Sequence, residues 1–157
     1  MGPTDSTIGA ISNRLERIKR GEDPQMLARL TSGVAILGKY QPDPVRGACM
    51  LIPDPVVPSL NDLDGDARCA FLSDFACLGD AILAATGAER INYLILCNRV
   101  PELHGHAIPR FAGEDPEKRL LGPFEAYDFG GARVADAEGE DADLAAVLRD
   151  ALTRGRS

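Results

Sequence analysis

The residues best suited to chemistry are His104 and His106, which are the only histidines among the 157 residues. They lie in the run 103–110, with the sequence LHGHAIPR. On a strand, alternate side chains share a face, so both imidazoles would point the same way as the guanidinium of Arg110. We expect Pro109 to end the sheet pairing before that arginine. An imidazole titrates near neutral pH and a guanidinium binds phosphate oxygens, so this row predicts a site that acts on a phosphate.

Taken alone, a His-x-His pair on a strand has three interpretations: a polar surface, a metal site or a catalytic site. Glu102 could be a third metal ligand, but on a strand it would lie about 13 Å from His106. The sequence contains no second cluster of histidines and cysteines that could supply another ligand. We expect neither a metal ion nor a cofactor, although all three interpretations stay open from these residues alone.

The run 102–110, ELHGHAIPR, resembles the motif of the histidine-triad (HIT) nucleotide hydrolases and transferases. That motif is His-φ-His-φ-His-φ-φ, usually followed by Pro-Arg. Its second and third histidines correspond to His104 and His106, and Glu102 stands in place of the first. The run 90–98 looks like the preceding strand of that fold, and Asn98 falls where many members carry a phosphate-contacting Gln or Asn. The resemblance extends over residues 32–110.

The resemblance implies that His104 attacks the α-phosphorus of a nucleotide and forms a nucleotidyl-histidine intermediate. His106 and Asn98 would hydrogen-bond the phosphate, and Arg99 and Arg110 would be further substrate-binding candidates. Dinucleoside polyphosphates and nucleoside phosphoramidates are the implied substrates, and a homodimer is the implied assembly. Two alternatives remain: a nucleotide-binding module with weak turnover, and a metal-dependent hydrolase that uses the His-x-His pair.

Glu102 is the main departure from the motif, and we count it among the substrate-binding candidates. A carboxylate about 4 Å from a phosphate charge costs on the order of 4 kcal/mol at an effective dielectric near 20. Glu102 therefore pairs with a cation, or turns away from the pocket, or faces a ligand that is less anionic than a polyphosphate. We favour an ion pair with Arg99, which is three residues away.

The elements around this row predict an α+β fold with an antiparallel sheet of about five strands, one long helix packed on it and a C-terminal helix, and the resemblance implies that the sheet is histidine-triad-like. The long helix has an amphipathic stripe and Gly87 as its C-cap. The expected helices cover residues 12–20, 62–86 and 143–152, with a helical turn at 26–30. The expected strands cover residues 34–37, 47–52, 91–97 and 103–109, with a short edge strand at 127–129.

Three parts follow along the chain: an N-terminal extension with short helices (1–31), a HIT-like domain (32–130), and an acidic linker with the C-terminal helix (131–157). Residues 130–141 are small and acidic, and we interpret them as flexible. A homodimer would protect an exposed edge strand, which we expect near residues 48–52 or Tyr127.

The resemblance implies a small nucleotide ligand as the partner, and the composition of the chain excludes other classes of partner. The formal charge of −7 argues against nucleic-acid binding, which needs a basic face. The sequence contains no C-x-x-C pair, so we expect its cysteines to be small buried residues in a reducing compartment. We identify no signal region and no apolar run of membrane length, and therefore predict a cytoplasmic protein without a membrane partner.

Overall fold

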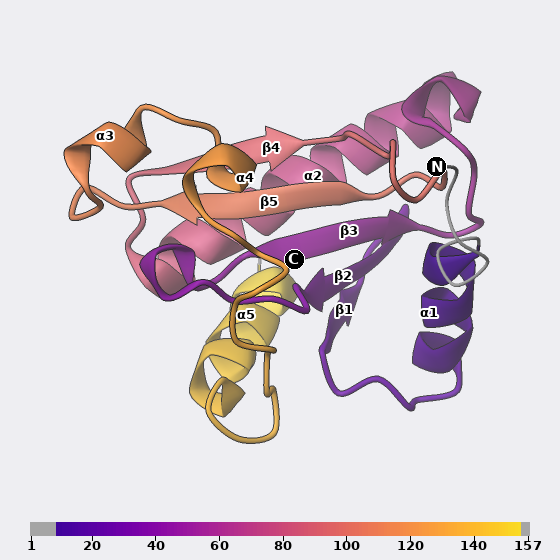
Figure 1. Ribbon diagram of the computed structural model, residues 1–157. Helices are drawn as coiled ribbons and strands as arrows, with labels where there is room; N and C mark the ends of the chain where they lie inside the picture. The colour runs from indigo at the N-terminus through magenta and orange to yellow at the C-terminus, as the bar shows by residue number, and fades with distance from the viewer. Residues whose placement is uncertain (1–8, 155–157) are drawn as a thin grey trace.

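The computed structural model describes residues 9–154, which form a five-stranded antiparallel sheet flanked by helices (Figure 1). The strands lie in the order β1-β2-β3-β5-β4, with bounds Met26–Arg29, Gly33–Leu37, Cys49–Pro53, Gly105–Arg110 and Arg90–Leu94. The helices are α1 (Ala10–Lys19), α2 (Gly65–Thr86), α3 (Pro116–Arg119), α4 (Pro123–Ala126) and α5 (Ala142–Arg154), with 3-10 helices at Asp43–Val45 and Leu60–Asp62. The predicted α+β class is confirmed.

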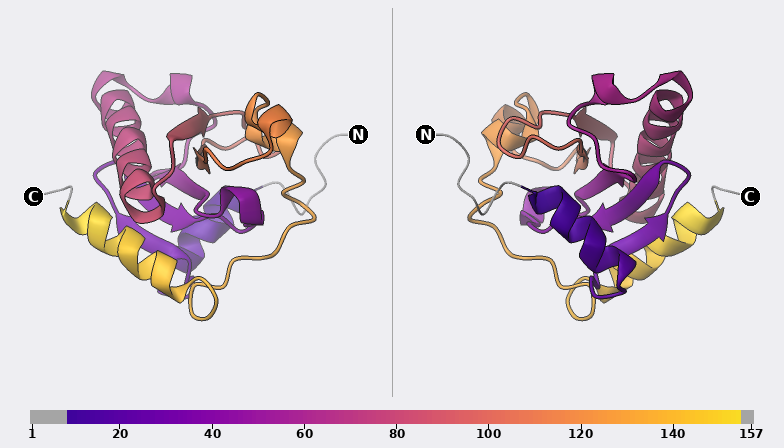
Figure 2. Two further views of the ribbon diagram at one scale, coloured as in Figure 1. Left: turned by 90° about the vertical axis from the view of Figure 1, so that its left-hand side faces the viewer. Right: turned by 90° about the vertical axis from the view of Figure 1, so that its right-hand side faces the viewer.

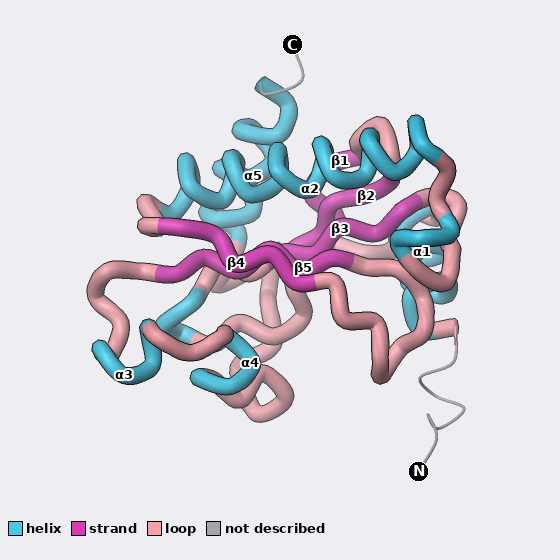
Figure 3. Tube along the Cα trace, turned by 90° about the horizontal axis from the view of Figure 1, so that it is seen from above, coloured by secondary structure: helices cyan, strands magenta, loops and turns pink. Residues whose placement is uncertain are grey.

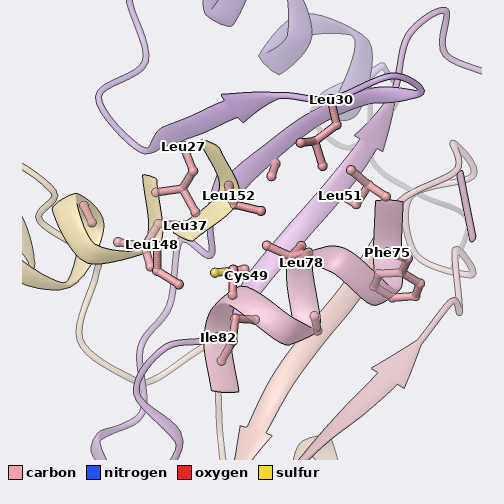
Figure 4. Packing of buried hydrophobic residues seen from close by; sticks show 14 of the residues in the cluster. Leu27, Leu30, Leu37, Cys49, Leu51, Phe75, Leu78, Ile82, Leu148 and Leu152 are labelled. Atoms are coloured by element: carbon pink, nitrogen blue, oxygen red, sulfur yellow. The ribbon is translucent and has the colours of Figure 1, made fainter. Parts of the chain in front are cut away.

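Helices α2 and α5 cover one face of the sheet (Figure 3). Helix α2 starts after Asp64, whose side chain accepts a hydrogen bond from the Ala67 N–H at 2.9 Å. It ends at the predicted C-cap, Gly87, in the left-handed conformation with φ 71°. The predicted apolar stripe of α2 packs against α5 and the strands in a mainly aliphatic core, which includes Leu51 and Leu78 (Figure 4).

By length and composition alone, α2 could also cross a membrane, since its mean hydropathy is 1.5 over a membrane-length window. The expectation that the sequence contains no such run is therefore wrong. This is weak evidence for a membrane span, because the core helix of a globular protein passes the same test. The face of α2 that carries Phe71, Phe75 and Ile82 is buried in the core.

The opposite face of the sheet is covered in two halves. Helix α1 packs over β2 and β3 through Ile11, Leu15 and Ile18. The segment 111–130, which includes α3 and α4, lies on the same face beside β5 and β4 (Figure 3). The chain then runs along the side of the molecule to α5 (Figure 2). The histidine row therefore lies beneath the second half of this cover.

Strand β5 has the predicted alternation. Ala107 packs in the α2 core, whereas Ile108 packs in the cluster on the other face. Strand β4 is shorter than predicted and stops at Leu94. Strand β5 continues through Pro109 to Arg110, contrary to our expectation. Pairing with β3 ends at Ala107, so the missing N–H of Pro109 interrupts no ladder on that side.

Two short elements differ from prediction. Residues 26–29 form β1 rather than a helical turn, because the Leu30 N–H bonds to the Gly33 carbonyl at 2.7 Å and closes a hairpin with β2. Four apolar residues are too few to distinguish the two by periodicity. Residues 127–129 form no strand, because the Tyr127 hydroxyl donates to buried Glu114 at 2.5 Å and turns the chain inward.

The edges of the sheet are β1 and β4, whereas residues 48–52 belong largely to the internal strand β3. The predicted edge at 48–52 or Tyr127 is therefore wrong. The segment 130–141 is anchored, not flexible, because its buried Asp141 forms ion pairs with Arg46 at 2.9 Å and Arg133 at 2.8 Å.

The structure also corrects the expectation for the cysteines. All four are free thiols, and Cys49 is buried as predicted. Cys69 and Cys77, however, lie on the exposed face of α2, and Cys97 is half-buried. The apolar stripe predicts which face of α2 is buried, but Cys69 and Cys77 lie outside that stripe and are exposed.

Candidate functional site

Both histidines line a pocket of about 680 Å³ on the face of the sheet opposite α2. Its floor is formed by the start of β5, and its walls come from the loop that follows β4 and from the segment around α4. The lining residues are Tyr40, Leu96, Cys97, Asn98, Arg99, Val100, His104, His106, Phe124, Tyr127, Asp128, Phe129 and Gly130. The walls are mainly apolar, with one guanidinium and one carboxylate in the lining.

His104 is fixed by the backbone of its own loop. The Nδ1–H of its ring donates to the Glu102 carbonyl at 2.7 Å, and the thiol of Cys97 lies 3.8 Å from the same nitrogen. The residue is 8% exposed. Since a neutral imidazole carries one proton, this bond leaves the lone pair on Nε2. His104 therefore has the tautomer that a nitrogen nucleophile requires.

His106 stands beside His104 with its ring edge-on, 5.1 Å between centroids and 84° between planes. Its other neighbour is Phe124, whose ring lies 5.2 Å away, also edge-on. Burial, with a smaller electrostatic contribution from the neighbouring His104, lowers the pKa of His106 to about 4. His106 is thus neutral at pH 7 and offers a hydrogen bond rather than a positive charge.

Asn98 and Arg99 both line the pocket and are exposed, so the structure brings these two candidates together with the histidines. They follow Cys97, whose backbone has a positive φ of 54°. This left-handed residue turns the chain after β4, so that residues 98 and 99 lie at the mouth of the pocket instead of continuing the strand. The amide of Asn98 is a donor, and Arg99 is the cation among the lining residues.

Glu102 turns away from the pocket. Its carboxylate accepts hydrogen bonds from the backbone N–H of Ile11, at 3.2 Å, and from the hydroxyl of Ser12, both in the first turn of α1. Among the described residues, no ion pair joins Glu102 to Arg99. The favoured pairing with Arg99 is therefore wrong, and the second of the three alternatives holds.

Arg110 shares the face of the histidines but does not line their pocket. It is 6% exposed and pairs with Glu114 at 3.0 Å. Its other donors bind the side chain of Asn92 at 2.8 Å and the carbonyls of Leu121, at 2.7 Å, and Lys118, at 2.8 Å. Its N–H groups thus bind the segment 114–121 and Asn92 of β4, and none is left for a phosphate.

Glu114 also connects this anchor to the pocket wall. Burial raises the pKa of its carboxyl, but hydrogen bonds from Arg110 and Tyr127 outweigh it and leave the pKa below its ordinary value. Burial, together with the hydrogen bond to Glu114, raises the pKa of Tyr127 to about 12. Tyr127 is therefore a neutral hydrogen-bonded wall residue at neutral pH.

Sequence reasoning missed the wall formed by Phe124, Tyr127, Asp128 and Phe129. The sequence did contain a signal, because three of the eight phenylalanines and tyrosines of the chain fall within residues 124–129. The rings of Phe124 and Phe129 meet edge-on with centroids 4.9 Å apart. In residues 9–154, no group of three or more His, Cys, Asp or Glu side chains could hold a metal ion.

No protein-family model and no curated protein matches the chain, but solved structures do. A histidine triad protein from Sinorhizobium meliloti is 25% identical, with a TM-score of 0.65 over 86% of this chain and 93% of that chain. One from Bradyrhizobium japonicum is 21% identical, with a TM-score of 0.66 over 87% and 94%. A hypothetical histidine triad nucleotide-binding protein from Sulfolobus tokodaii is 18% identical, with a TM-score of 0.67 over 90% and 92%. The chain therefore has the fold of the histidine-triad proteins, as its motif predicted.

Proposed function

We propose that this protein is a nucleotide-binding hydrolase or transferase that cleaves a nucleoside phosphate derivative, either a dinucleoside polyphosphate or a phosphoramidate. The observation that carries the proposal is the hydrogen bond from the Nδ1–H of His104 to the Glu102 carbonyl at 2.7 Å. This bond fixes the ring and leaves the Nε2 lone pair for attack on phosphorus.

In the proposed reaction, the Nε2 lone pair of His104 forms a bond to the α-phosphorus. The bond from phosphorus to the leaving oxygen or nitrogen breaks, and the leaving group takes the electron pair and a proton from solvent, which the water of the second step returns. Water then attacks the nucleotidyl-His104 intermediate, releases the nucleoside monophosphate and restores the free imidazole. Splitting one displacement into two in this way is the advantage of covalent catalysis.

The neighbouring residues bind the phosphate and the leaving atom. His106, neutral at pH 7, donates a hydrogen bond to the phosphate or to the leaving atom. Asn98 donates to a non-bridging oxygen, and Arg99 adds positive charge at the pocket mouth. Arg110 and Glu102 have no part in substrate binding in this proposal, because other residues occupy their polar groups.

The test is to incubate the protein with a panel of dinucleoside polyphosphates and nucleoside phosphoramidates and to measure the released monophosphate. His104→Asn should abolish release, and His106→Ala should reduce it less completely. A phosphorus–nitrogen bond is labile in acid and stable in base, so a nucleotidyl-His104 adduct should be trapped at high pH and found by mass spectrometry.

A matched pair of arginine variants isolates the contribution of Arg99. Arg99→Gln should raise KM several-fold, whereas Arg119→Gln, in a separate surface pocket beside β4, should not. Turnover by His104→Asn at the parent rate would refute the nucleophile. Ligand binding without turnover by the parent would instead favour the alternative of a nucleotide-binding module.

We also propose that the protein is a cytoplasmic homodimer. Support for the dimer comes from the two strand edges, β1 and β4, which have no partner on their outer side in the described chain. Light scattering over a range of concentrations tests this assembly. A mass near 16.7 kDa at every concentration would contradict it.

A further inference from the structure

Glu102 joins two parts of the molecule that are far apart in the sequence. Its backbone carbonyl accepts the hydrogen bond from His104, and its carboxylate accepts hydrogen bonds from Ile11 and Ser12, about ninety residues earlier. One residue thus contacts both the proposed nucleophile and the first turn of α1.

The first turn of α1 depends on this carboxylate. The N-cap residue, Gly9, has no side chain and provides no capping hydrogen bond, and the first turn contains no acidic residue. The free N–H groups and the positive end of a helix dipole normally require an acceptor, preferably an anion. The carboxylate of Glu102 supplies both a hydrogen-bond acceptor and a negative charge from outside the helix.

The loop that contains Glu102 is held on both sides. The Glu102 N–H bonds to the Val100 carbonyl at 2.8 Å, and Val100 packs against the cluster that α1 forms with β2 and β3. The Leu103 N–H bonds to the Val57 carbonyl at 2.7 Å, and Leu103 is fully buried. The carbonyl of Glu102 is therefore placed by α1 from one side and by the core from the other.

We propose that Glu102 is a positioning residue that couples the docking of α1 to the orientation of the His104 imidazole. When α1 is docked, the Glu102 carbonyl is held where it binds Nδ1–H. When the link is lost, the bond from the Leu103 N–H to Val57 alone holds this peptide unit, so the Glu102 carbonyl moves more, and His104 samples the other tautomer and other ring orientations. The effect on turnover rests on the proposed function, whereas the effect on the imidazole rests on the geometry alone.

Three variants remove the link to different extents. Glu102→Ala removes both side-chain hydrogen bonds, and Ser12→Ala removes one without changing the histidine motif. Glu102→Gln retains an acceptor but loses the charge, so its effect should be intermediate. Arg14→Gln is the matched control, because it breaks the ion pair of the same helix with Asp23 (3.0 Å) and leaves Glu102 untouched.

The primary measurement is the nitrogen NMR spectrum of the histidine side chains, which distinguishes the two neutral tautomers. The parent should show His104 with its proton on Nδ1. Glu102→Ala should show a mixture of tautomers, and Ser12→Ala a smaller fraction of the second. With an active substrate, kcat of Glu102→Ala should fall roughly three- to tenfold, the effect of losing about one hydrogen bond, with KM within about twofold. Adding Ser12→Ala to Glu102→Ala should change neither readout further.

An unchanged His104 tautomer in Glu102→Ala would overturn the coupling. So would a shift in Arg14→Gln as large as that in Glu102→Ala, because the Arg14 variant keeps both hydrogen bonds of Glu102 and the effect would then not pass through that residue. If Glu102→Ala does not fold, Ser12→Ala and Glu102→Gln provide the same comparison. A parent that turns over no substrate would refute the proposed function, and the NMR comparison would still decide the coupling.

Discussion

Gly105, between the two histidines, should tolerate no side chain. A Cβ added there would lie 2.7 Å from Cζ of Phe75 and 3.0 Å from both Cε atoms of that ring. Phe75 is 4% exposed and packs edge-on against Tyr93, with 4.9 Å between centroids. The ring therefore cannot move aside without disturbing a second aromatic contact.

Gly105→Ala should lower the free energy of unfolding by about 1–3 kcal/mol, the usual cost of one extra carbon in a packed core. For a domain of this size, each kcal/mol lowers Tm by about 2–4 °C. Urea unfolding followed by circular dichroism measures the change. Because β5 must shift to relieve the clash, kcat should fall as well, since a small displacement of His104 misaligns the attack.

Phe75→Leu in the same chain should recover part of the loss, since it removes the atoms that clash. The two changes should therefore be non-additive by about 1 kcal/mol or more. Gly65→Ala is the control, because nothing lies within 4 Å of a Cβ at that helical position. A Gly105→Ala protein within 0.5 kcal/mol of the parent would refute the packing argument.

Three further predictions concern charge and the nucleophile. The unfolded chain protonates His106 near pH 6.5 and the folded chain only near pH 4, so the free energy of unfolding should fall as pH drops between these values; a titration of His106→Phe should show a smaller fall. Chiefly through hydrogen bonding from Arg133, the pKa of Asp141 is held at about 2, so its stabilisation is complete above about pH 4 and lost towards pH 2. Asp141→Asn should cost about 1–3 kcal/mol at pH 7 in the same urea assay, and an unchanged midpoint would contradict it. His104→Asn should form no acid-labile nucleotide adduct, and an adduct by mass spectrometry would show that another residue is the nucleophile.

The fold was predictable where the pattern is long or specific. The 22-residue α2 and its Gly87 cap follow from periodicity and one glycine, and the alternation of β5 follows from the histidine motif. Strand β1 was not predictable, because its identity depends on pairing with β2 rather than on its own four residues. Short elements of this kind are decided by tertiary contacts.

The same distinction applies to the site. The motif and the residues just before it could bring together His104, His106, Asn98 and Arg99, because these four lie within nine residues of one another. The partners of Glu102 could not, since Ile11 and Ser12 are about ninety residues away and carry no charge that would suggest a contact. From the sequence, an ion pair with the nearby Arg99 was the simplest partner for the Glu102 carboxylate, but the N-terminus of α1 binds it instead.

The packing of α5 on β1 has a consequence for synthesis. Arg149 of α5 donates to the carbonyls of Pro24, at 2.9 Å, and Met26, at 2.9 Å, across more than 120 residues. Leu27 and Leu148 belong to the same core, so the inner surface of β1 stays uncovered until residues 142–154 have left the ribosome. Until then the nascent chain exposes an apolar strand face, the kind of surface that aggregates or recruits chaperones. Completion of this sheet is therefore expected to follow translation of α5, while α2 is free to form as soon as it emerges.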